Sequence, residues 1–307
     1  LLLAGDFLVR GAVNLALRLG ISALLVSLTV VAFGTSAPEL LIVLSAMADG
    51  ASGLAMGNVI GSNTANILLV LGLPALIAGL HTADFFPKKS FLLMILATVL
   101  FIGLAFCGPF TWWHGGILLA VLLCILWDQG RSAQRDRQAA KTAALVAVEE
   151  DGLEGVDPTM PGWKIALYLM FGLVGLPIGA RVLVVNAELI AKDYGVPETA
   201  IGLTLIAVGT SLPELATTTI AAFRRQGDVA LGNVIGSNMF NLLAIIGIAA
   251  FVAPIPVDAA FLRFDLWIML AASLLLFPMV FFKINFTRMW GAGLTLLYMA
   301  YLFVVLL

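Results

Sequence analysis

Two glutamates carry the most unusual chemistry of this sequence, because each lies in an apolar stretch and both occupy the same motif. Glu39 belongs to Gly-Thr-Ser-Ala-Pro-Glu-Leu at residues 34–40, and Glu214 belongs to Gly-Thr-Ser-Leu-Pro-Glu-Leu at residues 209–215. Six of the seven positions match, at an offset of 175 residues. An ionisable group at membrane depth costs on the order of 2.5–3.5 kcal/mol by insertion scales, so such groups are rare and mostly functional. Two acids at equivalent repeat positions therefore indicate a binding site.

The residues around each glutamate suit a hard cation. Pro38 and Pro213 lack the N–H that a helix interior needs, so we expect the helix to break just before them. Such a break is tolerated at membrane depth where it is buried in protein or lines a cavity. Each glutamate then lies in the first turn of the following helix, whose positive end favours an ionised carboxylate. Further oxygens are expected from the carbonyls near Ala32, Thr35, Ala207 and Thr210 and from the Thr and Ser hydroxyls of the motif.

This mixture of carboxylate, carbonyl and hydroxyl oxygens matches Ca2+, which takes roughly six to eight oxygen ligands. No Cys, His or Met accompanies the motif, which disfavours soft metals.

A second block of ten residues repeats at the same offset. Gly-Asn-Val-Ile-Gly-Ser-Asn-Thr-Ala-Asn at 57–66 and Gly-Asn-Val-Ile-Gly-Ser-Asn-Met-Phe-Asn at 232–241 match at eight of ten positions. The glycines of the block, Gly57, Gly61, Gly232 and Gly236, allow close helix approach. Residues four apart share one helix face, which pairs Ser62 with Asn66 and Ser237 with Asn241. We expect Asn66 and Asn241 to line the site, whereas Asn63 and Asn238 fit site lining and interhelical hydrogen bonding equally well.

Composition indicates an integral membrane protein. Hydrophobic residues make up 62% of the 307 positions and charged residues 11%, and the mean hydropathy is +1.09. Soluble domains are about half apolar and a quarter charged. A net charge of -2 without a basic patch gives no reason to expect a nucleic-acid partner. The sequence opens on Leu1 inside an apolar run, so we expect a few leading residues to precede it.

Apolar runs of about 17 or more residues are candidate spanning helices. Ten are expected, at 1–19, 23–48, 53–79, 87–107, 111–128, 162–191, 198–223, 227–253, 261–282 and 288–307. The first five map onto the last five through the repeat offset, and an odd number of spans inverts the second copy in the membrane. The sequence thus predicts an all-α membrane protein with ten transmembrane helices as two inverted five-helix repeats, an architecture of secondary transporters. The first repeat is expected at 1–128, a cytoplasmic loop at 129–161 and the second repeat at 162–307.

Lys and Arg in short loops stay on the cytoplasmic side. With the N-terminus outside, twelve of the sixteen basic residues fall on the inner side: Arg18, Lys88, Lys89, Arg131, Arg135, Arg137, Lys141, Lys164, Arg224, Arg225, Lys283 and Arg288. The outer side receives Lys192 and Arg263, and Arg10 and Arg181 lie within spans. Both termini are therefore expected outside.

The paired motifs resemble the two alpha-repeats of the cation/Ca2+ exchanger superfamily, which includes the Na+/Ca2+ exchangers, and the resemblance covers nearly the whole chain. It implies that Glu39 and Glu214 are the central ligands shared by Ca2+ and Na+. It implies further ligands from the hydroxyls and carbonyls of Thr35, Ser36, Thr210 and Ser211, the carbonyls of Ala32 and Ala207, and the side chains of Ser62, Ser237, Asn66 and Asn241. Spans one and six, which cross the front of the site in this family, are expected to slide as the gate.

Two features depart from the family pattern. Family members often carry Asp at one of the positions held here by Asn66 and Asn241, so this site is limited to two acidic groups. In the first span Asp6 fits a family pattern, whereas Arg181 stands at the corresponding place of the sixth. We expect Asp6 to pair with Arg10, one helical turn further on, and Arg181 to lie close to mid-membrane.

Charge balance then separates the candidate functions. Two carboxylates balance one Ca2+, two monovalent cations or two protons. We predict a cofactor-free antiporter that exchanges Ca2+ for Na+ in a bacterial or archaeal plasma membrane, with H+ or K+ coupling as the alternative. A paired-acid intramembrane enzyme would need acids placed to activate water, whereas these lie among alcohols and carbonyls. A channel is the third class, and exchange against an opposing Ca2+ gradient would exclude it.

Overall fold

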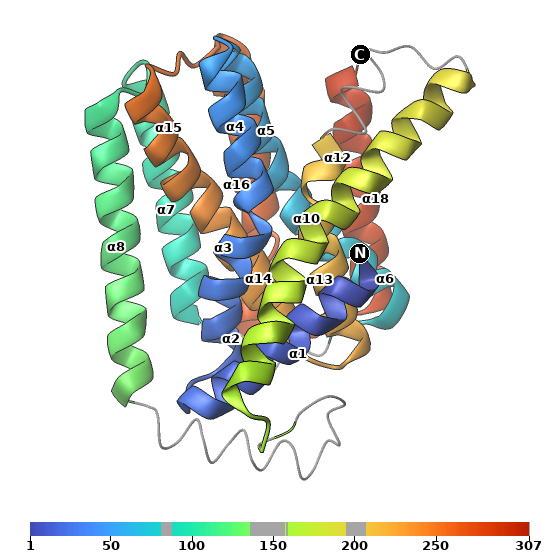
Figure 1. The fold of residues 1–307 in the computed structure, drawn as a ribbon. Coiled ribbons are helices and arrows are strands. Elements are labelled where there is room, and N and C mark those ends of the chain that lie inside the picture. The colour runs from blue at the N-terminus through green and yellow to red at the C-terminus, as the bar shows by residue number, and fades with distance from the viewer. Residues whose placement is uncertain (81–87, 136–156, 158, 195–206, 307) are drawn as a thin grey trace.

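The computed structural model describes residues 1–80, 88–135, 157, 159–194 and 207–306, and helices make up nearly all of them (Figure 1). The first half contains α1 (Leu2–Leu19), α2 (Ala23–Val26), η1 (Ser27–Val31), α3 (Ala32–Thr35), α4 (Ala37–Ala48), α5 (Ser52–Ala65), η2 (Asn66–Val70), α6 (Gly72–Ala78), α7 (Lys88–Phe106) and α8 (Trp112–Arg135), where η denotes a π-helical turn. The second half contains α10 (Gly162–Asp193), α12 (Ala207–Thr210), α13 (Leu212–Phe223), α14 (Gly227–Met239), η4 (Phe240–Ile245), α15 (Ile246–Val252), η5 (Phe261–Asp265), α16 (Leu266–Leu274), α17 (Phe277–Phe282) and α18 (Arg288–Leu306).

Eight segments of the described chain are long and apolar enough to cross a membrane. They are Ala23–Ala48, Ser52–Ala78, Lys88–Phe106, Trp112–Ser132, Gly162–Ile190, Gly227–Val252, Phe261–Phe282 and Arg288–Val305. The expected first span corresponds to α1, an 18-residue helix that carries three charged residues. The expected seventh span is described from Ala207 onward, as α12 and α13, and its first part lies outside the described residues. The expected spans therefore agree closely with the helices.

The segment expected as the loop at 129–161 begins within a helix. Helix α8 continues to Arg135, several residues past the expected end of the fifth span at 128. A helix can extend past the apolar region, because each backbone N–H bonds to the carbonyl four residues earlier whether the side chains are apolar or polar. The residues 136–156 and 158 of the loop lie outside the described part of the chain.

The outward faces of several helices are apolar. Leu123 and Trp127 of α8 and Leu296 of α18 are among the large hydrophobic side chains that are well exposed. Helix α10 shows the same pattern over most of its length. Apolar surface on this scale is not stable in water and fits contact with lipid, so the fold is that of an integral membrane protein.

An inverted pseudo-two-fold axis relates the two halves. Two isolated antiparallel bridges join them, one between Leu80 and Phe286 and the other between Phe110 and Ile255. The repeat offset of 175 converts Leu80 into Ile255 and brings Phe110 to within one residue of Phe286. The two bridges are therefore copies of one contact, each joining the end of the third span of one repeat to the end of the fourth span of the other.

Successive spans run in opposite directions, and their ends sort between two sides of the bundle. The C-terminal end of α8, the start of α10 and the turn between α13 and α14 lie at the lower side in Figure 1, whereas the C-terminal end of α18 lies at the upper side. The lower side is the one that holds the basic loops and helix ends assigned to the inner side by the sequence.

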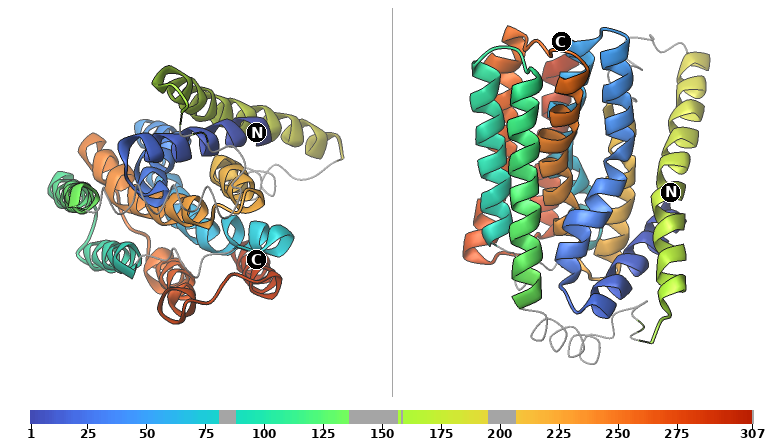
Figure 2. Two further views of the ribbon diagram at one scale, coloured as in Figure 1. Left: turned by 90° about the horizontal axis from the view of Figure 1, so that it is seen from below. Right: turned by 60° about the vertical axis from the view of Figure 1, so that its left-hand side comes forward.

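Glycines allow two close helix contacts that matter for the site. A Cβ on Gly236 of α14 would lie 2.4 Å from the carbonyl oxygen of Leu28, and one on Gly232 would lie 2.6 Å from the Leu24 carbonyl oxygen. Close approach is therefore confirmed for this copy of the block. The equivalent neighbours of Gly57 and Gly61 are residues 199–207, most of which lie outside the described residues. Helices α1 and α10 also pack side by side (Figure 2), and a Cβ on Gly172 would lie 2.5 Å from the Cβ of Leu8.

Candidate cation-binding site

The two motif glutamates lie in the interior of the bundle. Glu39 is in the first turn of α4 and Glu214 in the first turn of α13, as expected from the prolines that precede them. Their exposed fractions are 1% and 0%, and the two carboxylates are close enough for their charges to interact. Two acids so near each other in a dry interior repel strongly, so a cation between them lowers the energy of the pair.

Each helix is interrupted at one residue ahead of its glutamate. Ser36 separates α3 from α4 with φ −82° and ψ 1°, and Ser211 separates α12 from α13 with φ −84° and ψ 5°. The break is thus narrower than the motif led us to expect. The carbonyl of Ala32 is not freed by it, because this oxygen accepts the Ser36 N–H at 3.0 Å and lies 3.3 Å from the Thr35 hydroxyl. Ala207 is described as the first residue of α12, without its side-chain surroundings.

Hydroxyls from both repeats lie around Glu214. The Ser36 hydroxyl donates to Glu214 Oε1 at 3.3 Å. The hydroxyls of Thr35 and Ser237 face the same carboxylate and lie 3.5 Å from each other. Under the repeat offset this last contact becomes the contact between Thr210 and Ser62, whose hydroxyls are 3.4 Å apart. The structure therefore brings the Thr and Ser residues named from the sequence together around the pseudo-two-fold axis.

Several buried oxygen atoms at this place have no hydrogen-bond partner among the described residues. They are Glu39 Oε2, Glu214 Oε2, Ser211 Oγ, Asn63 Oδ1, Asn66 Oδ1 and Asn241 Oδ1. A buried polar atom without a partner costs about 1–3 kcal/mol, so isolated cases are rare and each needs an explanation. Carboxylate, hydroxyl and amide oxygens of this kind are the ligands that a hard cation prefers. The described residues contain no cluster of three or more His, Cys, Asp and Glu, so neutral oxygens would complete the ligand set.

The asparagines of the second repeated block differ in their contacts. Asn66 donates to Asn238 Oδ1 at 3.1 Å, and the Asn238 amide nitrogen lies 3.3 Å from the Asn63 carbonyl. Asn63 itself donates to Val59 of its own helix at 2.8 Å. Asn238 thus joins α14 to the first repeat, which favours interhelical hydrogen bonding over lining of the site for this residue. Asn241 is fully buried, and neither of its side-chain polar atoms has a partner in the described chain.

Sequence reasoning missed Asn233 as a member of the site. Its amide nitrogen donates to the Thr218 hydroxyl at 3.2 Å and lies 3.4 Å from the carbonyl of Glu214, and its Oδ1 lies 3.2 Å from the Thr35 hydroxyl. Asn233 therefore orients both the backbone of α13 and a hydroxyl of the other repeat. The signal was available, because Asn58 and Asn233 stand in the second position of the repeated block.

Each copy of the block ends in a π-helical turn. The turn η2 begins at Asn66, and η4 begins at Phe240, immediately before Asn241. A π-turn inserts one residue into the helix and is often found at functional sites. Asn66 and Asn241 therefore lie where the regular α-helical hydrogen-bond pattern is interrupted.

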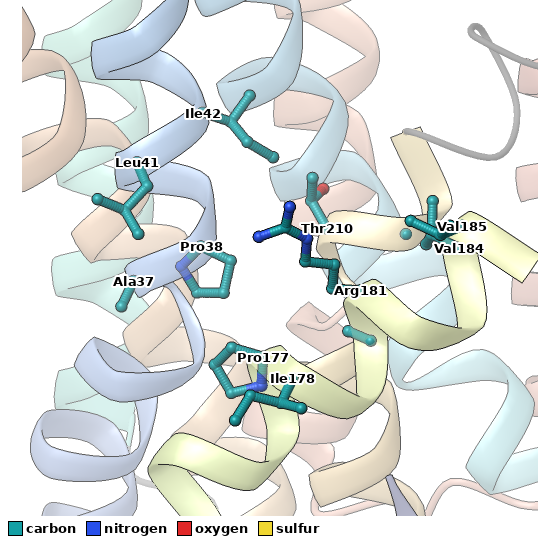
Figure 3. A pocket seen from close by; sticks show the side chains of 12 residues that line it. Ala37, Pro38, Leu41, Ile42, Pro177, Ile178, Arg181, Val184, Val185 and Thr210 are labelled. Atoms are coloured by element: carbon teal, nitrogen blue, oxygen red, sulfur yellow. The ribbon is translucent and has the colours of Figure 1, made fainter.

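A pocket of about 470 Å³ lies beside the site, between α4, α10 and α12. Pro38 of α4 and Gly209 and Thr210 of α12 form the walls next to the glutamate motifs, and the rest of the lining is almost wholly apolar. Arg181 of α10 extends into the space between Pro38 and Thr210 (Figure 3).

A helical membrane fold of two inverted repeats, with interrupted helices and buried carboxylates at their junction, is the architecture of secondary transporters. A family model for the sodium/calcium exchanger protein matches residues 1–129 and 164–307. The chain is 37% identical over 286 residues to CaxA of Alkalimonas amylolytica, with 91% of this chain and 86% of that protein covered. It is 31% identical to the sodium/calcium exchanger MaX1 of Methanosarcina acetivorans, with coverage of 98% and 93%.

The solved structures agree with the sequence relatives. A structure of the sodium-calcium exchanger NCX_Mj soaked with 2.5 mM Na+ and 0.1 mM Ca2+ superimposes with a TM-score of 0.80 at 29% identity, covering 97% of this chain and 93% of that one. This chain therefore belongs to the sodium/calcium exchanger family.

Proposed function

We propose that this protein exchanges Ca2+ for Na+ across a bacterial or archaeal plasma membrane by alternating access, with Glu39 and Glu214 as ligands that both ions share. The observation that carries the proposal is the pair of buried carboxylates, each with one oxygen that lacks a partner in the described chain. Their combined charge balances one Ca2+ or two Na+. A site filled by one set or the other before it reorients exchanges ions and does not leak them.

We infer the neutral ligands from the repeated motifs, and the buried polar groups around the two carboxylates support this choice. We assign them to the hydroxyls of Thr35, Ser36, Thr210 and Ser211, the side chains of Ser62, Ser237, Asn66 and Asn241, and the carbonyl of Ala207. The Ala32 carbonyl is left out of the set, because it already accepts the Ser36 N–H. These groups supply hard oxygens, which Ca2+ and Na+ prefer over softer ligands. The name of MaX1 as a sodium/calcium exchanger supports the choice of ions, because that relative matches nearly the full length of this chain.

The membrane orientation follows from the distribution of basic residues. We infer that the side with the C-terminal end of α8 and the start of α10 is cytoplasmic, since Lys and Arg in short loops stay inside. The loop between the repeats is then cytoplasmic and both termini are outside.

The test is uptake of 45Ca by proteoliposomes under imposed gradients of Na+, K+ or H+. We expect uptake when Na+ is loaded inside, including uptake against an opposing Ca2+ gradient, and no uptake driven by K+ or H+ alone. Uptake that follows the pH gradient and ignores Na+ would replace Na+ by H+ as the coupling ion. Flux that only runs down the Ca2+ gradient would indicate a channel and contradict exchange.

A matched variant connects this flux to the site. Glu39→Gln keeps the size and hydrogen-bonding shape of the side chain and removes its charge, so we expect Na+-driven uptake to be lost. Glu188→Gln, on α10 outside the site, removes one acid from a membrane-spanning helix and serves as the control. Equal flux in Glu39→Gln and the unaltered protein would contradict the assignment.

A further inference from the structure

Asp6 of α1 is held by two arginines from different elements. Arg10 of the same helix places Nε 2.9 Å from Asp6 Oδ2, as expected from the sequence. Arg224 donates from Nε to Asp6 Oδ1 at 2.6 Å, a contact that the sequence did not reveal. The Arg224 side chain is only 10% exposed. Because Arg224 caps the C-terminal end of α13, this ion pair fastens α1 to that end of α13.

The repeat offset turns this ion pair into a second pair with the charges exchanged. Asp6 corresponds to Arg181 of α10, and Arg224 corresponds to Asp49, which caps the C-terminal end of α4. The two caps have the same backbone, with φ −85° and ψ 1° at Asp49 and φ −84° and ψ 5° at Arg224. The following residue is left-handed in both turns. The inverted symmetry that sets Arg224 opposite Asp6 therefore provides an equivalent place for Asp49 opposite Arg181.

The second pair is not formed in this structure. Neither Arg181 nor Asp49 has an ion-pair partner among the described residues. Arg181 instead lines the pocket between α4 and α10 (Figure 3). Asp49 is exposed at the end of α4.

The helix packing around the two pairs shows the same difference, with contact between α1 and α13 and a pocket between α10 and α4. On the first face, a Cβ on Gly5 of α1 would lie 3.3 Å from the carbonyl oxygen of Ala216 in α13, so the helices touch. The equivalents of Gly5 and Ala216 are Ala180 and Leu41, and both line the pocket. One gate interface is closed in this structure, and its symmetry mate is open.

Hydrogen bonds inside the site show the same asymmetry. Ser36 donates to Glu214, whereas the hydroxyl of its equivalent, Ser211, has no partner in the described chain. Asn66 donates to Asn238, whereas the equivalent amide nitrogen of Asn241 has none. Two hydrogen bonds donated by residues of the first repeat thus have no counterpart at the equivalent residues of the second repeat.

We propose that Asp6–Arg224 and Asp49–Arg181 are alternating latches, each formed in the state in which the other is open. This proposal rests on the proposed transport function and names the groups that hold each gate shut. Helices α1 and α10 pack tightly against each other through Gly172 and Gly11, so they move as one unit. A shift that releases α1 from the end of α13 carries α10 toward the end of α4. Exchanging one ion pair for another keeps the two states close in energy, which a reversible cycle requires.

The first test measures how open the pocket is, without any ion gradient. Cys107 and Cys124 are free and exposed, so both are replaced by Ala, and Leu41→Cys serves as a reporter in the pocket wall. The rate of alkylation by a charged maleimide is then measured in nanodiscs. Asp6→Asn and Arg224→Gln each remove the ion pair that is formed in this structure. The state in which the pocket is closed is then favoured, so each variant should slow labelling roughly fivefold or more, the usual range of conformational coupling.

The opposite latch must give the opposite sign. Arg181→Gln and Asp49→Asn should raise the labelling rate or leave it at its open-state limit, and should never lower it. Arg263→Gln removes a basic residue of η5 that belongs to neither latch and should change nothing. Equal effects of the two latches, or no effect of either, would overturn the proposal. Since labelling needs neither Ca2+ nor Na+, this outcome is independent of which ions are carried.

Charge reversal guards against variants that merely fold poorly. Arg181→Glu and Asp49→Arg should each lower the rate of ion exchange several-fold, because like charges then meet in the state in which α10 approaches α4. The double variant restores opposite charges and should recover most of the rate. A double variant as slow as the slower single variant would show that the two residues do not pair.

Discussion

At the level of single residues, the charge of the site is set by Glu39 and Glu214 alone. Asn66 and Asn241, which we propose as ligands, would add amide oxygens without charge, and each Oδ1 is buried without a partner in the described chain. Two negative charges are neutralised by one Ca2+ or by two monovalent ions, so a cycle that exchanges these sets moves no net charge. Under the proposed ligand set, the uncharged Asn residues therefore limit the number of ions exchanged in each cycle.

A third carboxylate at the Asn241 position should change that number. Asn241→Asp is expected to raise Ca2+ affinity roughly tenfold or more, because the affinity of oxygen sites follows the charge count of their ligands. It should also make exchange sensitive to membrane potential, since a third monovalent ion is then needed for balance. Calorimetric Ca2+ titration and 45Ca flux at clamped potentials measure the two effects.

The control for this change is Asn186→Asp, which adds the same charge at an exposed position of α10. Its Ca2+ affinity should equal that of the unaltered protein. An unchanged affinity in Asn241→Asp would remove Asn241 from the ligand set.

At the level of elements, the site depends on how closely α14 approaches the helix before the glutamate motif. The backbone of α14 lies against η1 through Gly236, and this contact keeps Ser237 and Asn233 within reach of Thr35. Any side chain at Gly236 would push the two repeats apart at the level of the ions.

Gly236→Ala should therefore lower both stability and transport. Its Cβ would meet the Leu28 carbonyl oxygen at 2.4 Å and the Ala32 Cβ at 2.5 Å, and overpacking of this kind costs about 1–3 kcal/mol. Gly103→Ala, on α7, meets nothing within 4 Å among the described residues and should be neutral or slightly stabilising. Thermal unfolding in detergent compares the two variants. Equal melting temperatures would show that α14 can shift without cost.

At the level of the whole molecule, the inverted repeat sets both the fold and its two states. Much of this could be predicted from the sequence, because apolar length defines each span and the offset pairs Glu39 with Glu214. The span expected at 261–282, for example, corresponds to Phe261–Phe282. The Asp6–Arg224 contact could not be predicted, since it depends on how α1 and α13 are rotated and tilted against each other. The repeat also does not predict which of the two equivalent interfaces is closed, because the same sequence is compatible with either arrangement.

The orientation of the molecule gives a prediction at this scale. In intact cells an impermeant maleimide should label Ala51→Cys, in the turn between α4 and α5, and should not label Thr287→Cys, just before α18. The background again carries Cys107→Ala and Cys124→Ala. Permeabilised cells should label both positions, which controls for accessibility. The reverse pattern would place the basic side outside and contradict the orientation.

Calorimetric titration of the purified protein with Ca2+ shows whether the two buried glutamates bind the transported ion. We expect one Ca2+ to bind per chain and to be displaced by Na+, and we expect this binding to be lost in Glu39→Gln and in Glu214→Gln. Both variants should elute as the unaltered protein does in gel filtration. Ca2+ binding of unchanged stoichiometry and affinity in the two folded variants would contradict the account.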